Sequence, residues 1–293
     1  MPTIRLAALS DPHLVPPGAP ASGVFNNRLE FETALPRLEI ALERCVKAGP
    51  DAIVALGDIT DLGDDESLDA AVERFAATGT PAWLVGGNHD TRGRGGGRAL
   101  EEAVTRDGAQ EVRVPPAAGI QWSGASVVGV ALSHQDGGYR PRLAERLGQD
   151  VSTDRLLVVL SHFPLLSLQD EVVAAGWKYA GDLLGLEEVA RPVLERSGPT
   201  IVLHGHLHLG ASTLRDRLLQ IGCPPLIEAP FEITHLAIRI DVADAVEVAV
   251  RREQVWPTDG HSAWPQLARR EQAWRYDGSN WLTVDPGDAS VRP

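Results

Sequence analysis

The chain lacks the features that would suit it to a membrane or to an oxidising compartment. No apolar run approaches the roughly 20 residues that a membrane-spanning helix needs, and two cysteines, Cys45 and Cys223, are too few for a disulfide framework. The first residues, MPTIRLAALSDPHL, have a short apolar run without a long hydrophobic region or a cleavage pattern, so we expect a strand rather than a signal peptide. These absences predict a cytoplasmic protein with no membrane partner.

Positive charge is also scarce. The sequence has 27 Lys and Arg against 40 Asp and Glu, which gives a formal net charge of −13. Proteins that bind nucleic acid through their whole surface are usually basic, so nucleic acid is a disfavoured partner. An acidic chain can still bind a phosphate locally if metal ions supply the positive charge. Hydrophobic residues make up 43%, which is ordinary for a globular protein and too many for a disordered one.

Strand-like and helix-like patterns alternate through the first two thirds of the chain. Strand patterns cover residues 4–11, 51–58, 82–87, 120–134, 155–163 and 200–210, and helix patterns cover residues 31–49, 66–79, 98–108, 140–149 and 186–198. Strand patterns then dominate from about residue 214 to residue 251. This order predicts mixed sheets covered by helices.

The last 41 residues differ in composition from the rest, so we expect a catalytic domain over residues 1–252 and an extension over residues 253–293. The extension contains Trp256, Trp264, Trp274 and Trp281 with little periodicity. The favoured interpretation is a segment that wraps back over the domain. The alternative is a lid over the site or a contact that forms a homodimer. The final residues, DPGDASVRP, are expected to be disordered.

Five strand-like segments end in side chains that can bind metals. The strand ends carry SDPH at 10–13, GD at 57–58, GNHD at 87–90, SHFP at 161–164 and HGHLH at 204–208. Each block alone is weak, because a Gly-Asp pair is usually a turn and a single histidine is usually only hydrogen-bonded. His206 and His208 are a stronger signal, because they point the same way on an extended segment. Sites in open α/β sheets gather at the carboxyl ends of strands, so the combination predicts one shared metal centre.

The order of the blocks, D-x-H, G-D-x-x-D, G-N-H-D, H and G-H-x-H, resembles the calcineurin-like metallophosphoesterase family. The resemblance covers roughly residues 4–250 and implies an α/β fold, a four-layer αββα sandwich of two mixed β-sheets flanked by helices. It also implies two divalent or trivalent metal ions. Oxygen and imidazole donors without thiolates suit Mn, Fe, Zn or Co.

The resemblance assigns a role to each block. It assigns Asp11, His13 and His208 to the first metal, Asn88, His162 and His206 to the second, and Asp58 to a bridging position between both. We expect Asp61 to lie behind the ligands or to brace its loop. For His204, a hydrogen-bonding role beside the site is favoured over metal ligation.

Two residues that adjoin Asn88 are expected to be catalytic. His89 would stabilise the transferring phosphoryl group or protonate the leaving alkoxide. Asp90 would orient His89 or help to hold it protonated. In the mechanism that we expect, a bridging hydroxide between the metals attacks phosphorus in line while the metals offset the charge of the other oxygens.

Two loops contain candidate substrate contacts. The stretch TRGRGGGR lacks the G-K-[ST] ending of a P-loop; Arg92 in it is a candidate phosphate contact, although a solvated loop is favoured. Phe25 could stack on a base, and Asn26 or Arg28 could meet a phosphate or a ribose. A loop that only caps a helix explains this second stretch equally well.

The opening SDPHL and the stretch GDITDLG are similar to bacterial class III cyclic-nucleotide phosphodiesterases and to related glycerophosphodiesterases. Those proteins usually have a second histidine where this chain has Ser161. We therefore predict a phosphodiesterase of small phosphodiesters, with a 3′,5′-cyclic-AMP-like substrate slightly favoured. The alternatives are a glycerophosphodiesterase or a metal-dependent phosphomonoesterase. A non-catalytic scaffold is disfavoured, because no ligand of the family pattern is missing.

Overall fold

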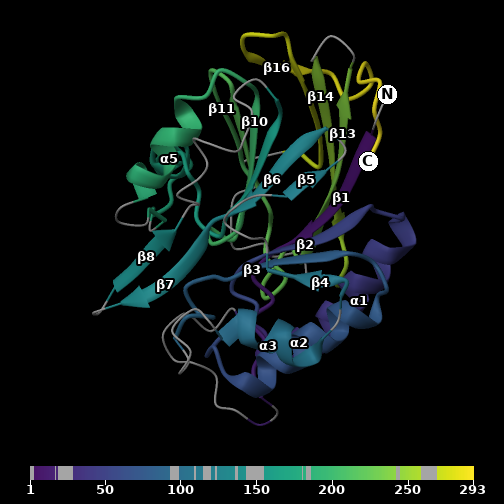
Figure 1. The fold of residues 1–293 in the computed structure, drawn as a ribbon, viewed down its shortest axis with the longest axis vertical. Helices are drawn as coiled ribbons and strands as arrows, with labels where there is room; N and C mark the ends of the chain where they lie inside the picture. Colours follow the sequence, from purple (N-terminus) through teal and green to yellow (C-terminus); the bar gives the residue numbers. More distant parts are fainter. Residues whose placement is uncertain are drawn as a thin grey trace.

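The structure is a computed structural model in which two β-sheets pack face to face (Figure 1). It describes residues 3–16, 18, 29–92, 99–108, 110–114, 120–122, 124–135, 138–142, 155–179, 181–182, 186–241, 245–258 and 269–293. Among these residues, no helix has both the length and the apolar character needed to cross a membrane.

The larger sheet contains both the first strands of the chain and the last ones. Its strands, in spatial order, are β16 (Trp281–Val284), β15 (Glu271–Tyr276), β14 (Val246–Gln254), β13 (Glu232–Ile240), β1 (Thr3–Leu9), β2 (Ala52–Leu56), β3 (Ala82–Val85) and β4 (Val112–Arg113). Strands β1 to β4 run parallel to one another, while β13 to β16 pair antiparallel. The carboxyl ends of β1, β2 and β3 therefore meet at one edge of this sheet.

The second sheet has the order β11 (Ser212–Arg215), β12 (Leu218–Gly222), β10 (Thr200–His204), β9 (Leu157–Leu160), β6 (Ala125–Gly129) and β5 (Ile120–Trp122). Its central strands β6, β9, β10 and β12 are parallel. A separate hairpin consists of β7 (Ala131–Gln135) and β8 (Gly138–Arg142) and projects from the side of the molecule (Figure 1). The carboxyl ends of β9 and β10 lead to the remaining histidines of the predicted site.

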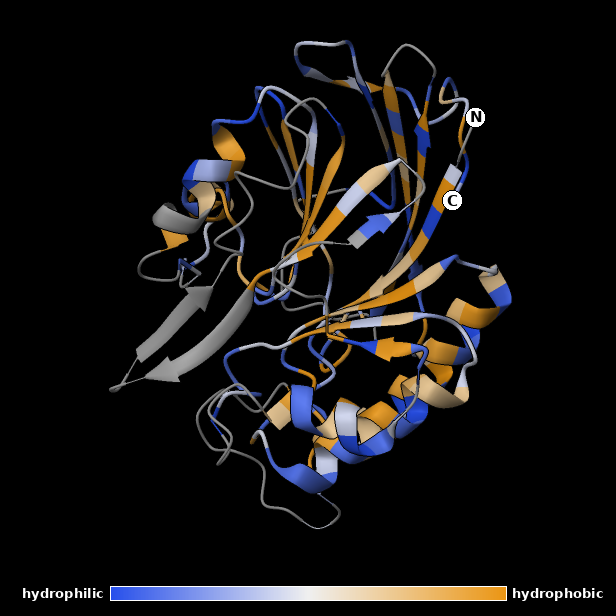
Figure 2. Cartoon of the chain, in the orientation of Figure 1, coloured by the Kyte–Doolittle hydropathy of each residue, from blue (hydrophilic) through white to orange (hydrophobic). Residues whose placement is uncertain are grey.

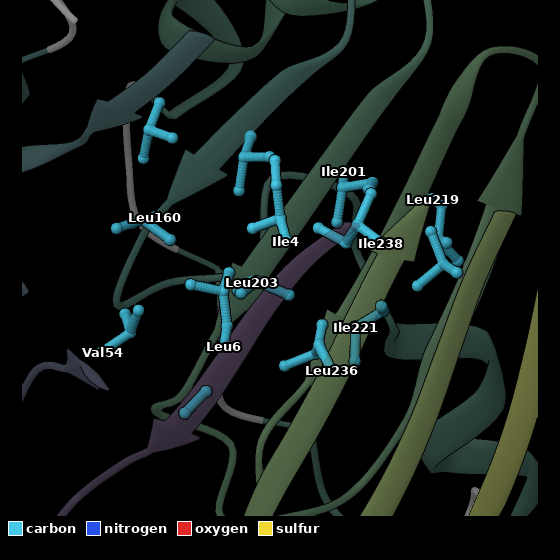
Figure 3. Packing of buried hydrophobic residues seen from close by; sticks show 14 of the residues in the cluster. Ile4, Leu6, Val54, Leu160, Ile201, Leu203, Leu219, Ile221, Leu236 and Ile238 are labelled. Atoms are coloured by element: carbon cyan, nitrogen blue, oxygen red, sulfur yellow. The ribbon is translucent and has the colours of Figure 1, made fainter. Parts of the chain in front are cut away.

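Alternating side chains explain why the sheets stack. On β1, Ile4 and Leu6 face the second sheet, while Ala7 and Leu9 pack under the helices. Successive side chains of a strand point to opposite faces, so an apolar strand between two layers is buried on both sides. Figure 3 shows Ile4 and Leu6 with Leu203 and other aliphatic side chains from both sheets in the central layer.

Helices cover the outer faces of both sheets (Figures 1 and 2). The helices are α1 (Ala34–Ala48), α2 (Asp65–Ala77), α3 (Ala99–Asp107), α4 (Gln169–Ala174) and α5 (Leu186–Leu194), with a short 3-10 helix at Phe31–Thr33. On α1, the helical spacing of Leu38, Ala41, Leu42 and Cys45 places all four in the core under the larger sheet. Helix α5 packs on the second sheet. The predicted αββα sandwich is therefore confirmed.

One predicted helix differs from the structure, and one helix of the structure was not predicted. Residues 140–142, which we assigned to a helix over residues 140–149, belong to strand β8, and the rest of that range lies outside the described residues. Here the pairing with β7 provides hydrogen bonds that helical periodicity alone cannot reveal. Helix α4 was not predicted, because its six residues are too few for a clear apolar stripe.

The C-terminal extension continues the larger sheet. The expected boundary at residue 252 falls inside β14, and β15 pairs with that strand. The prediction that residues 285–293 are disordered is wrong for this structure, because Ala289 and Val291 are buried. They pack against Ala237, Ala249 and Ala273 of the larger sheet. A homodimer through this extension stays a prediction.

Candidate active site and metal centre

The predicted ligands lie where the strands end and the backbone turns sharply. Five of them have a positive φ angle: Asp11 (51°), His13 (47°), Asp58 (47°), His206 (64°) and His208 (56°). Residues with a Cβ rarely adopt this left-handed backbone conformation. It costs energy and persists where the surrounding structure imposes it. Such residues cluster at functional sites, so the backbone itself marks this edge of the sheets as one.

Glycines allow the ligand loops to approach one another. A Cβ on Gly87 would collide with the backbone nitrogen and carboxylate of Asp58. A Cβ on Gly205 would collide with the hydroxyl of Ser10 and lie 2.7 Å from Asp11 Oδ2. The glycines that precede Asn88 and His206 in the sequence blocks are therefore required by close packing of the loops.

The structure brings the predicted ligands into connected groups. Three groups have ligand atoms within 4.8 Å of one another: Asp11, His13 and His208; Asp58, His162 and His206; and His13, Asp58 and His89. The first two match the two predicted metal sites. Asp58 Oδ2 lies 3.7 Å from His13 Nε2 and 3.3 Å from His162 Nε2, so one carboxylate oxygen faces both sites. Asn88 Oδ1 lies 3.0 Å from His162 Nε2 and completes the second group.

Buried atoms without partners show that these residues fit metal ions. Asp11 Oδ1 and His13 Nε2 are buried and have no hydrogen-bond partner among the described residues. A buried polar atom without a partner is costly, and a cation at this position would satisfy both atoms. Carboxylate, amide and imidazole donors are suitable ligands for Mn, Fe or Zn.

Burial and neighbouring charges shift the pKa values of these side chains in different directions. Burial would raise the pKa of Asp11, but the positive charge of His208, whose Nε2 lies 3.4 Å from Asp11 Oδ1, lowers this pKa to about 2. Burial would lower the pKa of His208 and of His162, but the carboxylates of Asp11 and Asp58 raise them to about 10 and about 9. For His206, burial dominates, and together with the charge of His162 it lowers the pKa to about 3. Metal binding would thus release protons from His162 and His208.

His89 lies at this centre with one ring nitrogen held by Asp61. His89 Nδ1 is 2.9 Å from the backbone oxygen of Asp61 and 3.0 Å from its Oδ1. The same Asp61 Oδ1 is 3.2 Å from Nδ1 of His13, so Asp61 lies behind both rings. Burial would lower the pKa of His89, but the hydrogen bond to Asp61 and the charge of Asp58 raise it. Nε2 of His89 faces Asp58, at 4.0 Å from Oδ2.

Asp90 does not take the position that we predicted for it. We expected it to orient His89, but its carboxylate accepts hydrogen bonds from the backbone nitrogens of Ile59 (3.1 Å), Thr60 (2.7 Å) and Gly87 (2.7 Å). The structure therefore places Asp61, rather than Asp90, beside the ring of His89. Asp90 thus connects the loop that follows Asp58 to the loop that contains Gly87 and Asn88.

We expect Asp90→Ala to destabilise the fold by at least about 3 kcal/mol, because each buried donor left without a partner costs about 1–3 kcal/mol. Urea denaturation would measure the change in the free energy of unfolding. Asp64→Ala is the matched comparison, because Asp64 caps α2 through a single hydrogen bond from Ser67, and loss of a cap costs about 1 kcal/mol. If Asp90→Ala costs no more than Asp64→Ala, Asp90 does not brace the loops.

The remaining predicted residues have different outcomes. His204 belongs to none of the ligand groups of the described residues; its Nδ1 lies 3.0 Å from the backbone oxygen of Gly205. Arg92 extends toward the site, with Nη1 3.0 Å from His89 Nδ1. The candidate contacts Phe25, Asn26 and Arg28 lie outside the described residues. Where related phosphodiesterases have a histidine, the Ser161 hydroxyl donates to its own loop at Phe163 O, 2.7 Å away.

One residue at the site was missed from the sequence. Glu228 Oε1 lies 2.6 Å from His208 Nδ1. The residue stands in the stretch LIEAPFE, which carries no metal-binding motif, and it follows His208 by 20 positions. No local signal could have found it, because only the packing of the loop after β12 brings it to His208.

The ligand blocks and the layered fold define a metal-dependent phosphoester hydrolase. The sequence profile of the calcineurin-like phosphoesterases matches residues 4–210, so the chain belongs to this family. The chain is 27% identical over 228 residues to a "probable cyclic nucleotide phosphodiesterase" of a Synechococcus strain, with 76% of this chain and 80% of that protein covered.

Solved structures share the fold at low sequence identity. A dimetal phosphatase from Danio rerio has a TM-score of 0.61 and 12% identity, with 86% of this chain and 96% of that chain covered. The protein TT1561 of Thermus thermophilus has a TM-score of 0.54 and 13% identity, with 87% of this chain and 100% of that chain covered. At this identity, the likeness supports the fold alone.

Proposed function

We propose that the protein is a dinuclear-metal phosphodiesterase that hydrolyses small phosphodiesters, with 3′,5′-cyclic nucleotides as the favoured substrate class. The observation that carries this proposal is the position of Asp58, whose Oδ2 faces both ligand groups. The cyclic-nucleotide preference is supported by the similarity to the Synechococcus protein, which is named a probable cyclic nucleotide phosphodiesterase.

In this proposal, Asp11, His13 and His208 would hold one metal, Asn88, His162 and His206 would hold the other, and Asp58 would be shared by both. When bound, the metal ions activate the attacking water and offset negative charge on the phosphate oxygens. The protein has a net charge of −13, so positive charge at the site is needed for an anionic diester to bind. Arg92, with its guanidinium beside His89, would add to it.

The proposed general acid is His89. Hydrolysis of a diester breaks a P–O bond, and the departing alkoxide needs a proton at neutral pH. Asp61 contacts Nδ1 of His89 and favours its protonated form. Nε2 is on the side of the ring that faces Asp58 and the two ligand groups, so the proton on Nε2 would be delivered there.

The experiment that tests the substrate class compares hydrolysis of 3′,5′-cyclic AMP, glycerophosphodiesters, bis(4-nitrophenyl) phosphate and 4-nitrophenyl phosphate in the presence of Mn²⁺. We expect kcat/KM for the cyclic nucleotide to reach about 10⁴ M⁻¹s⁻¹ or more, within the ordinary enzyme range. Hydrolysis of other diesters but not of cyclic AMP would support the assignment as a phosphodiesterase and would exclude cyclic AMP as a substrate. A preference for the monoester would contradict the proposal.

A further inference from the structure

Glu228 lies against the first ligand group although it is outside residues 4–210, which the family profile matches. Its side chain is 6% exposed and contacts Nδ1 of His208 at 2.6 Å. The other ring nitrogen, Nε2, lies 3.4 Å from Oδ1 of Asp11. The imidazole is thus held between two carboxylates, with Nε2 directed at the ligand group and Nδ1 directed away from it.

This geometry fits a carboxylate that prepares a histidine to bind a metal. A histidine whose Nδ1–H donates to a carboxylate presents Nε2 to the metal, has a fixed ring orientation and is a more basic ligand. We propose that Glu228 is a positioning residue of the first metal site, which sets the tautomer and orientation of His208 and thereby the metal affinity of that site. The proposal rests on the dinuclear function proposed above.

The backbone next to Glu228 is tied to the ligand Asp11. The nitrogen of Leu226 donates to Ser10 O at 2.9 Å, and the nitrogen of Ile227 donates to Asp11 O at 3.0 Å. Glu228 follows directly after these two residues. These backbone hydrogen bonds therefore fix the segment that carries Glu228 relative to Asp11, which belongs to the same ligand group as His208.

A buried arginine on α1 holds the same segment from the other side. Arg37 Nη1 donates to Leu226 O at 2.6 Å, and its guanidinium carbon lies 4.0 Å from the centre of the Phe231 ring. The nitrogen of Phe231 donates back to Glu228 O at 3.1 Å. Glu228 therefore lies on a short stretch that is anchored at both ends, as positioning of a ligand requires.

The chain provides a matched pair for comparison. His235 Nε2 lies 3.0 Å from Glu253 Oε2, and His235 is buried. Neither residue belongs to a ligand group of the described residues. Glu253→Gln therefore changes a histidine–carboxylate pair of the same chemistry away from the metal centre.

The test is titration of metal-free full-length protein with Co²⁺, followed by visible absorption and by metal analysis after gel filtration. We would compare wild type, Glu228→Gln, Glu228→Ala and Glu253→Gln, with circular dichroism to verify folding. Glu228→Ala should weaken one of the two binding steps by about 10- to 100-fold, as for loss of a carboxylate behind a metal-binding histidine. Glu228→Gln, which keeps an acceptor, should weaken the same step by less, and Glu253→Gln should change neither step.

Folded Glu228 variants whose two binding steps both stay within about threefold of wild type would overturn the inference. An equal weakening of both steps would also overturn it, since it would indicate a general loss of structure. If Glu228→Ala does not fold, the isosteric Glu228→Gln variant decides. If the wild type binds two ions and hydrolyses diesters while the Glu228 variants bind metal as the wild type does, only this inference is rejected. If the wild type does not bind two ions, the proposed function is rejected.

Discussion

Asp58→Asn should reduce kcat/KM by more than about 10³-fold, which exceeds the roughly 10²- to 10³-fold loss on removal of one preorganised donor. The substitution removes the negative charge of the carboxylate whose Oδ2 lies near both His13 and His162. An amide is neutral, so two cations placed close together would repel each other with less compensation. We therefore expect the variant to retain one metal ion or none, measured by metal analysis of the purified protein.

The control for Asp58→Asn is Asp69→Asn on the exposed surface of α2. Asp69 pairs there with Arg106 at 2.8 Å, and exposed ion pairs contribute about 0–1 kcal/mol, so activity and metal content should stay at the wild-type level. Full metal content together with full activity in Asp58→Asn would contradict the assignment of Asp58 to both sites.

His89→Ala should lower kcat by about 10²- to 10⁴-fold for a diester with a poor leaving group, the usual range for loss of general acid catalysis. The loss should be much smaller for bis(4-nitrophenyl) phosphate, because 4-nitrophenolate leaves without a proton. Metal content should stay at two ions, since His89 Nδ1 is held by Asp61 and the residue is not assigned as a ligand. Steady-state kinetics on both substrates would measure the two losses.

The pattern of losses separates the two roles that we considered for His89. Equal losses on both substrates would indicate that the ring stabilises the phosphoryl group rather than the leaving group. No loss on either substrate would contradict a catalytic role. His235→Gln serves as the control, because His235 lies on β13 and is paired with Glu253.

The order of strand and helix patterns predicted mixed sheets covered by helices, and the family resemblance added the two-sheet sandwich and the choice of candidate ligands. Alternation on β1 sends Ile4 and Ala7 to opposite cores, and this is visible in the order of the letters. The ligands stand in short blocks directly after apolar strands, and parallel strands such as β1 and β2 end at the same edge.

What could not be predicted depends on contacts between distant residues. Asp90 follows His89 in the chain, but it accepts from Ile59 and Gly87 on neighbouring loops. The polar stretch after residue 284 resembles a disordered end, but Val291 is buried because it packs against alanines of the larger sheet. Neither set of contacts exists until the larger sheet has formed.

The central claim is that two metal ions act together at the site that Asp58 shares. The most direct test is to remove all metal with a chelator and to restore Mn²⁺ in steps while hydrolysis of bis(4-nitrophenyl) phosphate is measured. The account predicts that the metal-free protein is inactive and that activity returns mainly with the second ion bound per chain. Full activity with one ion bound, or hydrolysis that persists without metal, would contradict it.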